Sequence, residues 1–380
     1  MTRRALLTTT IVILAIVAAF AYWNWSGQSL SSTQVRLGVL FPLTGDAAAY
    51  GAKGRNGIQL AVDDFNRSRQ CKRSLGVIFE DSAAQPETGL SGFDKLSSAD
   101  HVPAVIGDIV SAVTLAVAPA ANRSKTILLS PTASAPAITQ AGPYVYRIWP
   151  SDLEEGRAIA QYAIGKGFKR AAVLYMNNDY GVAIQAIFTR VFNIEGRQVV
   201  ASQSYMPTDQ DFRSALTRVA GENVDVLYVA GYYADSATIV RQARTLGMHM
   251  PILGTTAIED PQFLKLAGLD AEGIVYPLAT GFDASSTDPQ VVKFVDEFKT
   301  RFGQTPGWVE AQAYDAVAVL CQAMSGEKGT VTGQGLKDEL DQFAPMAGVT
   351  GTIKFDSNGD VVKPVRLRIV KGGKFTNLEP

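Results

Sequence analysis

Residues 102–136 read VPAVIGDIVSAVTLAVAPAANRSKTILLSPTASAP, and the order of residue types in this stretch decides the fold class. The short apolar run at 102–106 predicts a strand, residues 111–121 predict a helix, and the run at 126–129 predicts a second strand. Short apolar strands separated by helices are typical of a parallel sheet that helices cover on both faces. The stretch therefore predicts an α/β fold.

The same alternation of strands and helices continues on both sides of this stretch. Further strands are predicted at 35–41, 75–79, 171–175, 199–204, 224–229 and 251–253, and further helices at 180–194, 212–219, 234–246, 291–302 and 309–324. A second series starts near residue 151, where Ser151 and Glu154 form a capping box for a helix. After this series come two helices and a hairpin with its turn at 372–373. Such a tail indicates that the chain returns to complete two domains.

The length and the charge balance exclude one class of partner. The chain has 380 residues, which is enough for two domains or more at ~100–200 residues per domain. Its 35 basic and 36 acidic side chains give a formal net charge of -1. A nucleic-acid-binding protein needs a basic stripe to neutralise phosphates. The near-neutral balance therefore excludes nucleic acid as a partner.

The residue types that support catalysis and metal binding are scarce. Two cysteines and two histidines provide no Cys/His zinc site and no disulfide framework. No Gly-x-Ser-x-Gly elbow, His-Glu-x-x-His motif, Cys-x-x-Cys pair or Walker loop occurs. The adjacent carboxylates Asp63-Asp64 and Glu154-Glu155 point to different helix faces, so we expect solvated charges. The sequence predicts no catalytic residue, no metal and no cofactor, and therefore a protein that is not an enzyme.

The first 33 residues have the features of an export segment. Two arginines precede an uncharged apolar run at 11–21, as in a signal peptide, and residues 19–21 have the small-x-small form of a cleavage site. An uncleaved membrane anchor is the alternative, because residues 5–25 are long enough to span a bilayer of ~30 Å. Both interpretations predict that the rest of the chain is exported to the periplasm or the cell surface.

Hydroxyl and aromatic side chains follow several of the predicted strands. Ser111 follows the strand at 102–106 and is expected to cap the next helix, which would form an anion site. Small hydroxyl residues occupy the turn at 130–136, while Tyr180 opens a helix and Tyr232 follows another strand. In open α/β sheets ligands bind at the carboxyl ends of the strands. These residues therefore predict a site for a small polar ligand.

These segments resemble the type I periplasmic binding proteins of ABC importers, specifically the leucine/isoleucine/valine-binding branch. The likeness runs from about Gln34 to the C-terminus and rests on eight segments in family order. They are Leu43-Thr44-Gly45 with Tyr50-Gly51, 107–114, 129–136, 178–181, 230–232, 241–243, 266–268 with 272–273, and 314–317.

The resemblance implies two doubly wound, Rossmann-like lobes joined by three crossovers near residue 151, Thr280 and Val362. The implied first lobe comprises 34–150 and 280–362, and the implied second lobe comprises 151–279 and 363–380. Cys71 and Cys321 would both fall in the first lobe, and their spacing leaves open whether they pair.

The function implied by the resemblance is capture of a small polar ligand outside the cytoplasm. The expected ligand is a branched-chain amino acid or a related amino acid or carboxylate. The lobes would close on it about a hinge, and the monomeric protein would deliver it to an ABC transporter permease in the membrane. The alternative is a membrane-anchored sensory or regulatory module that binds an amide, a urea or an organic or aromatic carboxylate.

Site residues can be carried over from the family one by one. The resemblance implies that Ser111 and Ser134 bind a ligand carboxylate, and that the main-chain carbonyl of Thr132 meets an ammonium group. It also implies three tyrosines around the ligand, which are Tyr50 from the first lobe and Tyr180 and Tyr232 from the second.

The sequence departs from the family at Thr256. Amino-acid binders carry an acid here, shortly after the glycine that ends the last strand of the second lobe, and this acid neutralises the ligand ammonium. A threonine hydroxyl can hydrogen-bond an ammonium but cannot offset its charge. Two explanations stay open. Asp108, Asp235 or Glu259 supplies the charge from a neighbouring loop, or the ligand is not an α-amino acid.

Overall fold

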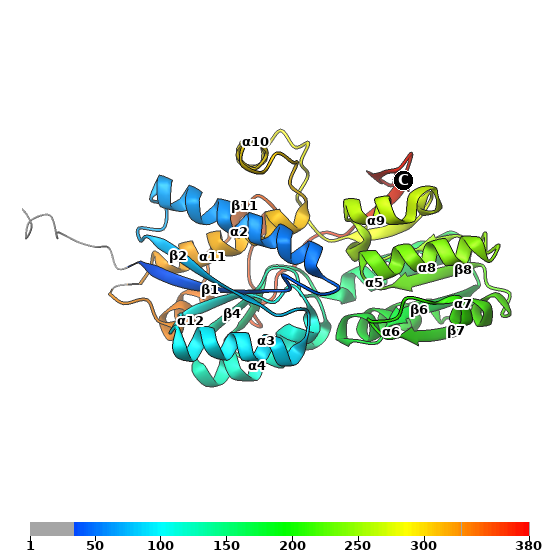
Figure 1. The fold of residues 1–380 in the computed structure, drawn as a ribbon, viewed down its shortest axis with the longest axis horizontal. Coiled ribbons are helices and arrows are strands. Elements are labelled where there is room, and N and C mark those ends of the chain that lie inside the picture. Colours follow the sequence, from blue (N-terminus) through cyan, green and yellow to red (C-terminus); the bar gives the residue numbers. More distant parts are fainter. Residues whose placement is uncertain (1–33, 328, 380) are drawn as a thin grey trace, which may run out of the picture.

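Two mainly parallel sheets, one in each half of the molecule, form the centre of the fold (Figure 1). The computed structural model describes residues 34–327 and 329–379. The predicted signal peptide or anchor, including residues 5–25, lies outside the described residues. Within the described part of the chain, no helix is long and apolar enough to cross a membrane.

The first sheet has five parallel strands in the order β2-β1-β3-β4-β5. Its strands are β1 (Val35–Phe41), β2 (Leu75–Asp81), β3 (Ala104–Gly107), β4 (Ile127–Ser130) and β5 (Val145–Arg147). Residues Leu37, Val39, Leu40 and Phe41 of β1 are all buried. A strand is apolar on both faces when helices cover both faces of its sheet.

Helices cover the two faces of this sheet in pairs. They are α2 (Ala48–Ser68), α3 (Pro86–Asp94), α4 (Ser111–Ser124), α10 (Pro289–Phe302), α11 (Trp308–Met324) and α12 (Gly333–Asp341). Helix α2 packs with α11 on one face, and α3 packs with α4 on the other (Figure 1). We call this sheet and its helices the first lobe.

The second sheet has seven strands in the order β14-β13-β10-β9-β8-β6-β7. Its strands are β6 (Arg170–Met176), β7 (Gln198–Tyr205), β8 (Val226–Ala230), β9 (Ile252–Leu253), β10 (Val275–Leu278), β13 (Arg366–Lys371) and β14 (Lys374–Asn377). The strands from β10 to β7 are parallel, and β13 and β14 add an antiparallel edge. The predicted hairpin turn is confirmed, and Gly372 and Gly373 both have positive φ, as a two-residue hairpin turn requires.

Five α-helices pack on the second sheet. They are α5 (Asp152–Gly165), α6 (Asp179–Phe192), α7 (Arg213–Ala220), α8 (Tyr233–Thr245) and α9 (Pro261–Ala267). Helix α5 packs against α6, and α8 packs against α7 and α9. A short 3-10 turn, η3 (Thr256–Ile258), follows β9. We call this sheet and its helices the second lobe.

The chain passes between the lobes three times. It crosses between β5 and α5, returns between β10 and α10, and crosses again between the β-bridge Phe355–Val361 and β13. The predicted α/β fold class with two lobes is therefore confirmed. The residue boundaries given above, at 150/151, 279/280 and 362/363, stay a prediction.

The two cysteines form a disulfide within the first lobe. Cys71 lies in the turn after α2, Cys321 lies on α11, and their Cα atoms are 4.8 Å apart. This pairing answers the question that the sequence left open. The bond joins positions separated by 250 residues, so it ties the end of α2 to the segment that returns from the second lobe.

Candidate functional site

A cavity lies between the two lobes, at the carboxyl ends of strands from both sheets. The space that no protein atom fills, including the opening to solvent, is about 470 Å³. All seven predicted site residues line it: Tyr50, Ser111, Thr132, Ser134, Tyr180, Tyr232 and Thr256. The structure therefore brings these seven residues together, while their role in binding stays a prediction.

Ser111 joins the two loops that form the first-lobe wall. It is the first residue of α4 and the N-cap is Val110, so the predicted cap is wrong. The carboxylate of Asp108 accepts the Val110 N–H at 2.7 Å and makes this turn without Ser111. The Ser111 hydroxyl oxygen instead accepts the N–H groups of Ser134 and Ala135, at 3.1 Å each. Because it accepts both bonds, its own hydrogen is available to a ligand.

Hydroxyls also fix the loop after β4 to the loop after β3. Ser130 donates to the Asp108 carbonyl at 2.6 Å and accepts the Ala133 N–H at 2.9 Å. Thr132 donates to the Ile109 carbonyl at 3.1 Å. The side-chain hydrogen of Thr132 is therefore already used within the protein. The cavity wall is rigid because its two loops are bonded to each other.

Arg147, which does not line the cavity itself, binds the loop after β4. Its guanidinium is fully buried and binds both carboxylate oxygens of Asp360 at 2.7 Å. The same side chain donates to the carbonyls of Ser134 and Ala135 at 3.0 Å. A bidentate Arg–carboxylate pair fixes direction as well as distance. Arg147 therefore orients the loop that presents Ser134 to the cavity.

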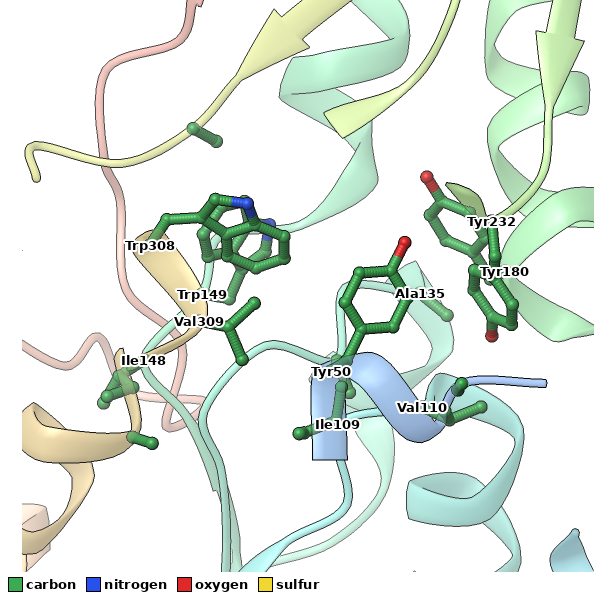
Figure 2. Packing of buried hydrophobic residues seen from close by; sticks show 14 of the residues in the cluster. Tyr50, Ile109, Val110, Ala135, Ile148, Trp149, Tyr180, Tyr232, Trp308 and Val309 are labelled. Carbon is green, nitrogen blue, oxygen red and sulfur yellow. The ribbon is translucent and has the colours of Figure 1, made fainter. Parts of the chain in front are cut away.

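Aromatic side chains form the rest of the wall (Figure 2). The rings of Tyr180 and Tyr232 stack with centroids 5.8 Å apart, and Tyr50 meets Tyr232 edge-on at 6.0 Å. On the other side, the indoles of Trp149 and Trp308 lie 4.8 Å apart. These rings leave space for an apolar group between polar walls.

Glu155 is a site residue that the sequence analysis missed. It lines the cavity from the first turn of α5 and is 1% exposed. Its Oε1 accepts the indole N–H of Trp149 at 3.0 Å, and its Oε2 contacts the hydroxyl of Thr256. The prediction of solvated charges is therefore wrong for Glu155, because its face of α5 lines the cavity and contacts Thr256 of η3.

The same correction applies to Asp64 on α2. Its carboxylate is buried and accepts the hydroxyl of Tyr314 at 2.6 Å and the ammonium of Lys293 at 3.1 Å. Adjacent Asp63 is exposed, as expected. Adjacent acids do point to different faces, but for both pairs one of the two faces is buried.

The three acids considered as substitutes for an acid at Thr256 do not line the cavity. Asp235 accepts the hydroxyl of Tyr205, and Glu259 binds Arg368 at 2.9 Å. Asp108 holds its own turn, as described above. The acid beside Thr256 is therefore none of these but Glu155. Burial raises the pKa of the Glu155 carboxyl to about 7.

Three side chains of the first lobe make polar contacts with the second lobe. The Tyr50 hydroxyl donates to the Ala257 carbonyl and accepts the N–H of Tyr233 at 3.2 Å. The Trp308 indole donates to the Glu259 carbonyl at 3.1 Å. A salt bridge at 2.6 Å joins Lys53 of α2 to Asp260, which caps α9. Side chains of the first lobe thus hold the start of η3 and α9 in the second.

Sequence comparison places relatives along almost the whole chain. The sequence model described as "Periplasmic binding protein" matches residues 34–374. The Leu/Ile/Val-binding protein BraC3 of Rhizobium johnstonii is 28% identical over 363 residues, covering 93% of this chain and 95% of the relative.

Solved structures agree with this comparison. The leucine-binding protein LivK of Thermotoga maritima has a TM-score of 0.85 and 29% identity, covering 91% of this chain and 98% of its own. The branched-chain amino-acid transporter substrate-binding protein LivJ of Streptococcus pneumoniae, solved with isoleucine, has a TM-score of 0.83 and 27% identity, covering 92% and 100%. Since the family model spans most of the sequence and the two lobes match these type I structures, the chain belongs to the periplasmic binding protein family.

Proposed function

We propose that the protein is an extracytoplasmic solute-binding protein that captures a small amino acid or carboxylate and delivers it to an ABC transporter permease. The observation that supports this most is the convergence of seven predicted residues, from strand ends of both sheets, on one buried cavity. The proposed work of the site is to bind and release. Hydroxyls, main-chain amides and aromatic rings are sufficient for it.

The first lobe supplies the anion-binding half in this proposal. The free hydrogen of Ser111 and the N–H groups at the start of α4 face a ligand carboxylate, and the positive end of the helix dipole favours it. Arg147 and Ser130 keep this wall in place before the ligand arrives. A site organised in advance loses less entropy on binding.

The second lobe covers the bound ligand in this proposal. Tyr180 and Tyr232 lie over the cavity on that side, and the cross-lobe contacts made by Tyr50, Lys53 and Trp308 stabilise the closed arrangement. Closure excludes water, so each charge of the ligand must find a partner within the protein. The three crossover segments are the proposed hinge.

The ligand class is supported by what the relatives hold. The isoleucine complex of the Streptococcus pneumoniae protein favours a branched-chain amino acid. Two Rhodopseudomonas palustris proteins that share this fold at 23% identity were solved with benzoate and with 3,4-dihydroxybenzoic acid. A carboxylate group is common to all three ligands, which agrees with the anion-binding half proposed for the first lobe.

Thermal unfolding with a ligand panel tests the proposal. L-leucine, L-isoleucine, L-valine, 4-methylpentanoate and benzoate are added separately, and native mass spectrometry identifies any small molecule that co-purifies. We expect at least one compound to stabilise the protein, by about 2.7 kcal/mol at a concentration of 100 times its Kd. A protein that carries no small molecule and is stabilised by none of these or of a wider panel of amino acids and carboxylates would contradict the proposal.

A further inference from the structure

We infer that the cavity takes a ligand with an ammonium group, and that Glu155 is the residue that neutralises it, in place of the acid that amino-acid binders carry at position 256. This inference rests on the proposed function and narrows it to amino acids. It concerns a residue on α5 of the second lobe, reached from a different segment of the chain than Thr256.

The position of Glu155 carries the first step. Its carboxylate lines the cavity, is 1% exposed and is held at both oxygens, by Trp149 on one side and Thr256 on the other. The side chain at position 256 is thus in contact with the acid. Amino-acid binders have the acid at the position of Thr256, whereas in this protein the acid is Glu155, which contacts Thr256. The part of the cavity that would meet an ammonium group therefore still contains a carboxyl group.

The second step concerns the hydrogen-bond donors that are available to the Glu155 carboxylate. The Thr256 hydroxyl has one hydrogen, and its oxygen contacts both the Pro277 carbonyl, at 2.7 Å, and Oε2 of Glu155. When this hydrogen is donated to Pro277, the donors that remain to the Glu155 carboxylate among the described residues are the Trp149 indole and the main-chain N–H of Thr256. A buried carboxylate with so few donors is costly. It needs either a proton of its own or a cation from the ligand.

The third step concerns the charged and titratable groups that surround Glu155. Asp152, one turn earlier on α5, is fully buried and lies beside the hydroxyl of Ser134. Tyr180 of α6 and Tyr228 of β8 face these two acids. Arg147 of β5 acts electrostatically on Asp152, but both carboxylate oxygens of Asp360 already bind its guanidinium. No residue lining the cavity is a lysine or an arginine.

This environment makes binding depend on pH in a direction that identifies the ligand class. Burial raises the pKa of Glu155 to about 7, and burial together with the charge of Glu155 raises the pKa of Asp152, so below about pH 7 the empty site holds a proton on this pair of carboxyls. A bound ammonium favours the ionised carboxylate and lowers the pKa. Amino-acid binding then releases the proton, and affinity rises with pH up to about 7 and levels off above it. A carboxylate without an amine needs the neutral acid, so its affinity falls as pH rises.

Calorimetry of matched ligands on the full exported chain tests the inference. L-leucine is compared with 4-methylpentanoate and L-valine with 3-methylbutanoate, which differ only by the amine, between pH 5.5 and 8. We expect at least one amino acid to bind about 30-fold or more tightly than its deaminated partner at pH 7.5. We also expect net proton release on amino-acid binding at pH 6, measured in two buffers of different ionisation enthalpy.

Variants separate Glu155 from its neighbour. Glu155→Gln removes the charge with little change in shape, and we expect it to lower amino-acid affinity about 30-fold or more and to abolish the pH slope. Glu154→Gln is the matched control, because Glu154 is exposed on the same helix and pairs with Arg157. We expect it to bind like the unmodified protein. If Glu155→Gln does not fold, proton release by the unmodified protein still decides the matter.

Several results would overturn the inference while the proposed function stands. They are equal or tighter binding of the deaminated compounds at pH 7.5, amino-acid affinity that Glu155→Gln leaves unchanged, and proton uptake in place of release. Failure of every amino acid in the panel also overturns it. Only the additional failure of the carboxylates and of any co-purifying molecule would reach the proposed function itself.

Discussion

Ser111 combines a structural contact with a proposed ligand contact, and the two can be separated. Its oxygen accepts two buried N–H groups, from Ser134 and Ala135. Ser111→Ala leaves both without that acceptor, which costs about 1–3 kcal/mol of unfolding free energy. We expect urea denaturation to show this loss without ligand, and calorimetry to show weaker binding of the ligand found above. The matched control is Ser124→Ala, at the far end of α4.

The Ser124→Ala control separates a loss of stability from a loss of ligand affinity. Ser124 donates to the Ala120 carbonyl at 3.0 Å, so its loss can lower stability but should leave affinity unchanged. If Ser111→Ala is destabilised and yet binds its ligand as tightly as the unmodified protein does, Ser111 only braces the loop and does not contact the ligand.

At the level of single residues, the sequence predicted the location of the candidate site. It did not predict which acid lies beside Thr256 in that site. Residues at strand ends could be assigned because parallel strands present their carboxyl ends at one edge. Glu155 lies four residues before Ile159 and eight before Ala163, on the buried face of α5. That spacing was a usable signal. What the sequence could not supply was the partner, because Thr256 is 101 residues away.

The disulfide acts at the scale of elements, since it joins the turn after α2 to α11. Replacing both cysteines by serine frees a loop of 250 residues in the unfolded chain. We expect the free energy of unfolding to fall by about 2–4 kcal/mol. Chemical denaturation of the unmodified protein, with and without reductant, gives the comparison. Equal stability of the oxidised and reduced protein would show that the bond contributes nothing to the first lobe.

The elements that the sequence did not predict are short or contain weak helix formers. Strand β5 spans only Val145–Arg147, and its pairing with β4 defines it. Helix α12 begins Gly333-Gln334-Gly335, and glycine is unfavourable in helices by about 1 kcal/mol. It forms because the Thr332 hydroxyl accepts the Gly335 N–H at 3.1 Å, and because Leu336 and Leu340 are buried. The cap is local, but the burial of the two leucines depends on tertiary packing, which the local sequence does not show.

At the scale of the whole molecule, the lobes touch through a few side chains whose loss need not unfold either lobe. Lys53 is 22% exposed and Asp260 is 1% exposed in the salt bridge that joins α2 to α9. Opening the cavity would expose Asp260 to water, so its charge needs Lys53 only in the closed arrangement. The salt bridge therefore biases the proposed opening and closing more than it stabilises the fold.

Lys53→Met tests this bias, because methionine keeps the packing of the lysine stem and removes its charge. The loss should cost the closed state about 1–3 kcal/mol, between the values of exposed and buried ion pairs, and so lower ligand affinity about 5- to 150-fold. Small-angle scattering should show larger dimensions without ligand. The matched control is Lys95→Met, since Lys95 pairs with Glu80 within the first lobe and should change neither quantity. Unchanged affinity and dimensions for Lys53→Met would mean that the salt bridge adds no net stability to the closed arrangement, and that other cross-lobe contacts, such as those of Tyr50 and Trp308, hold the lobes together.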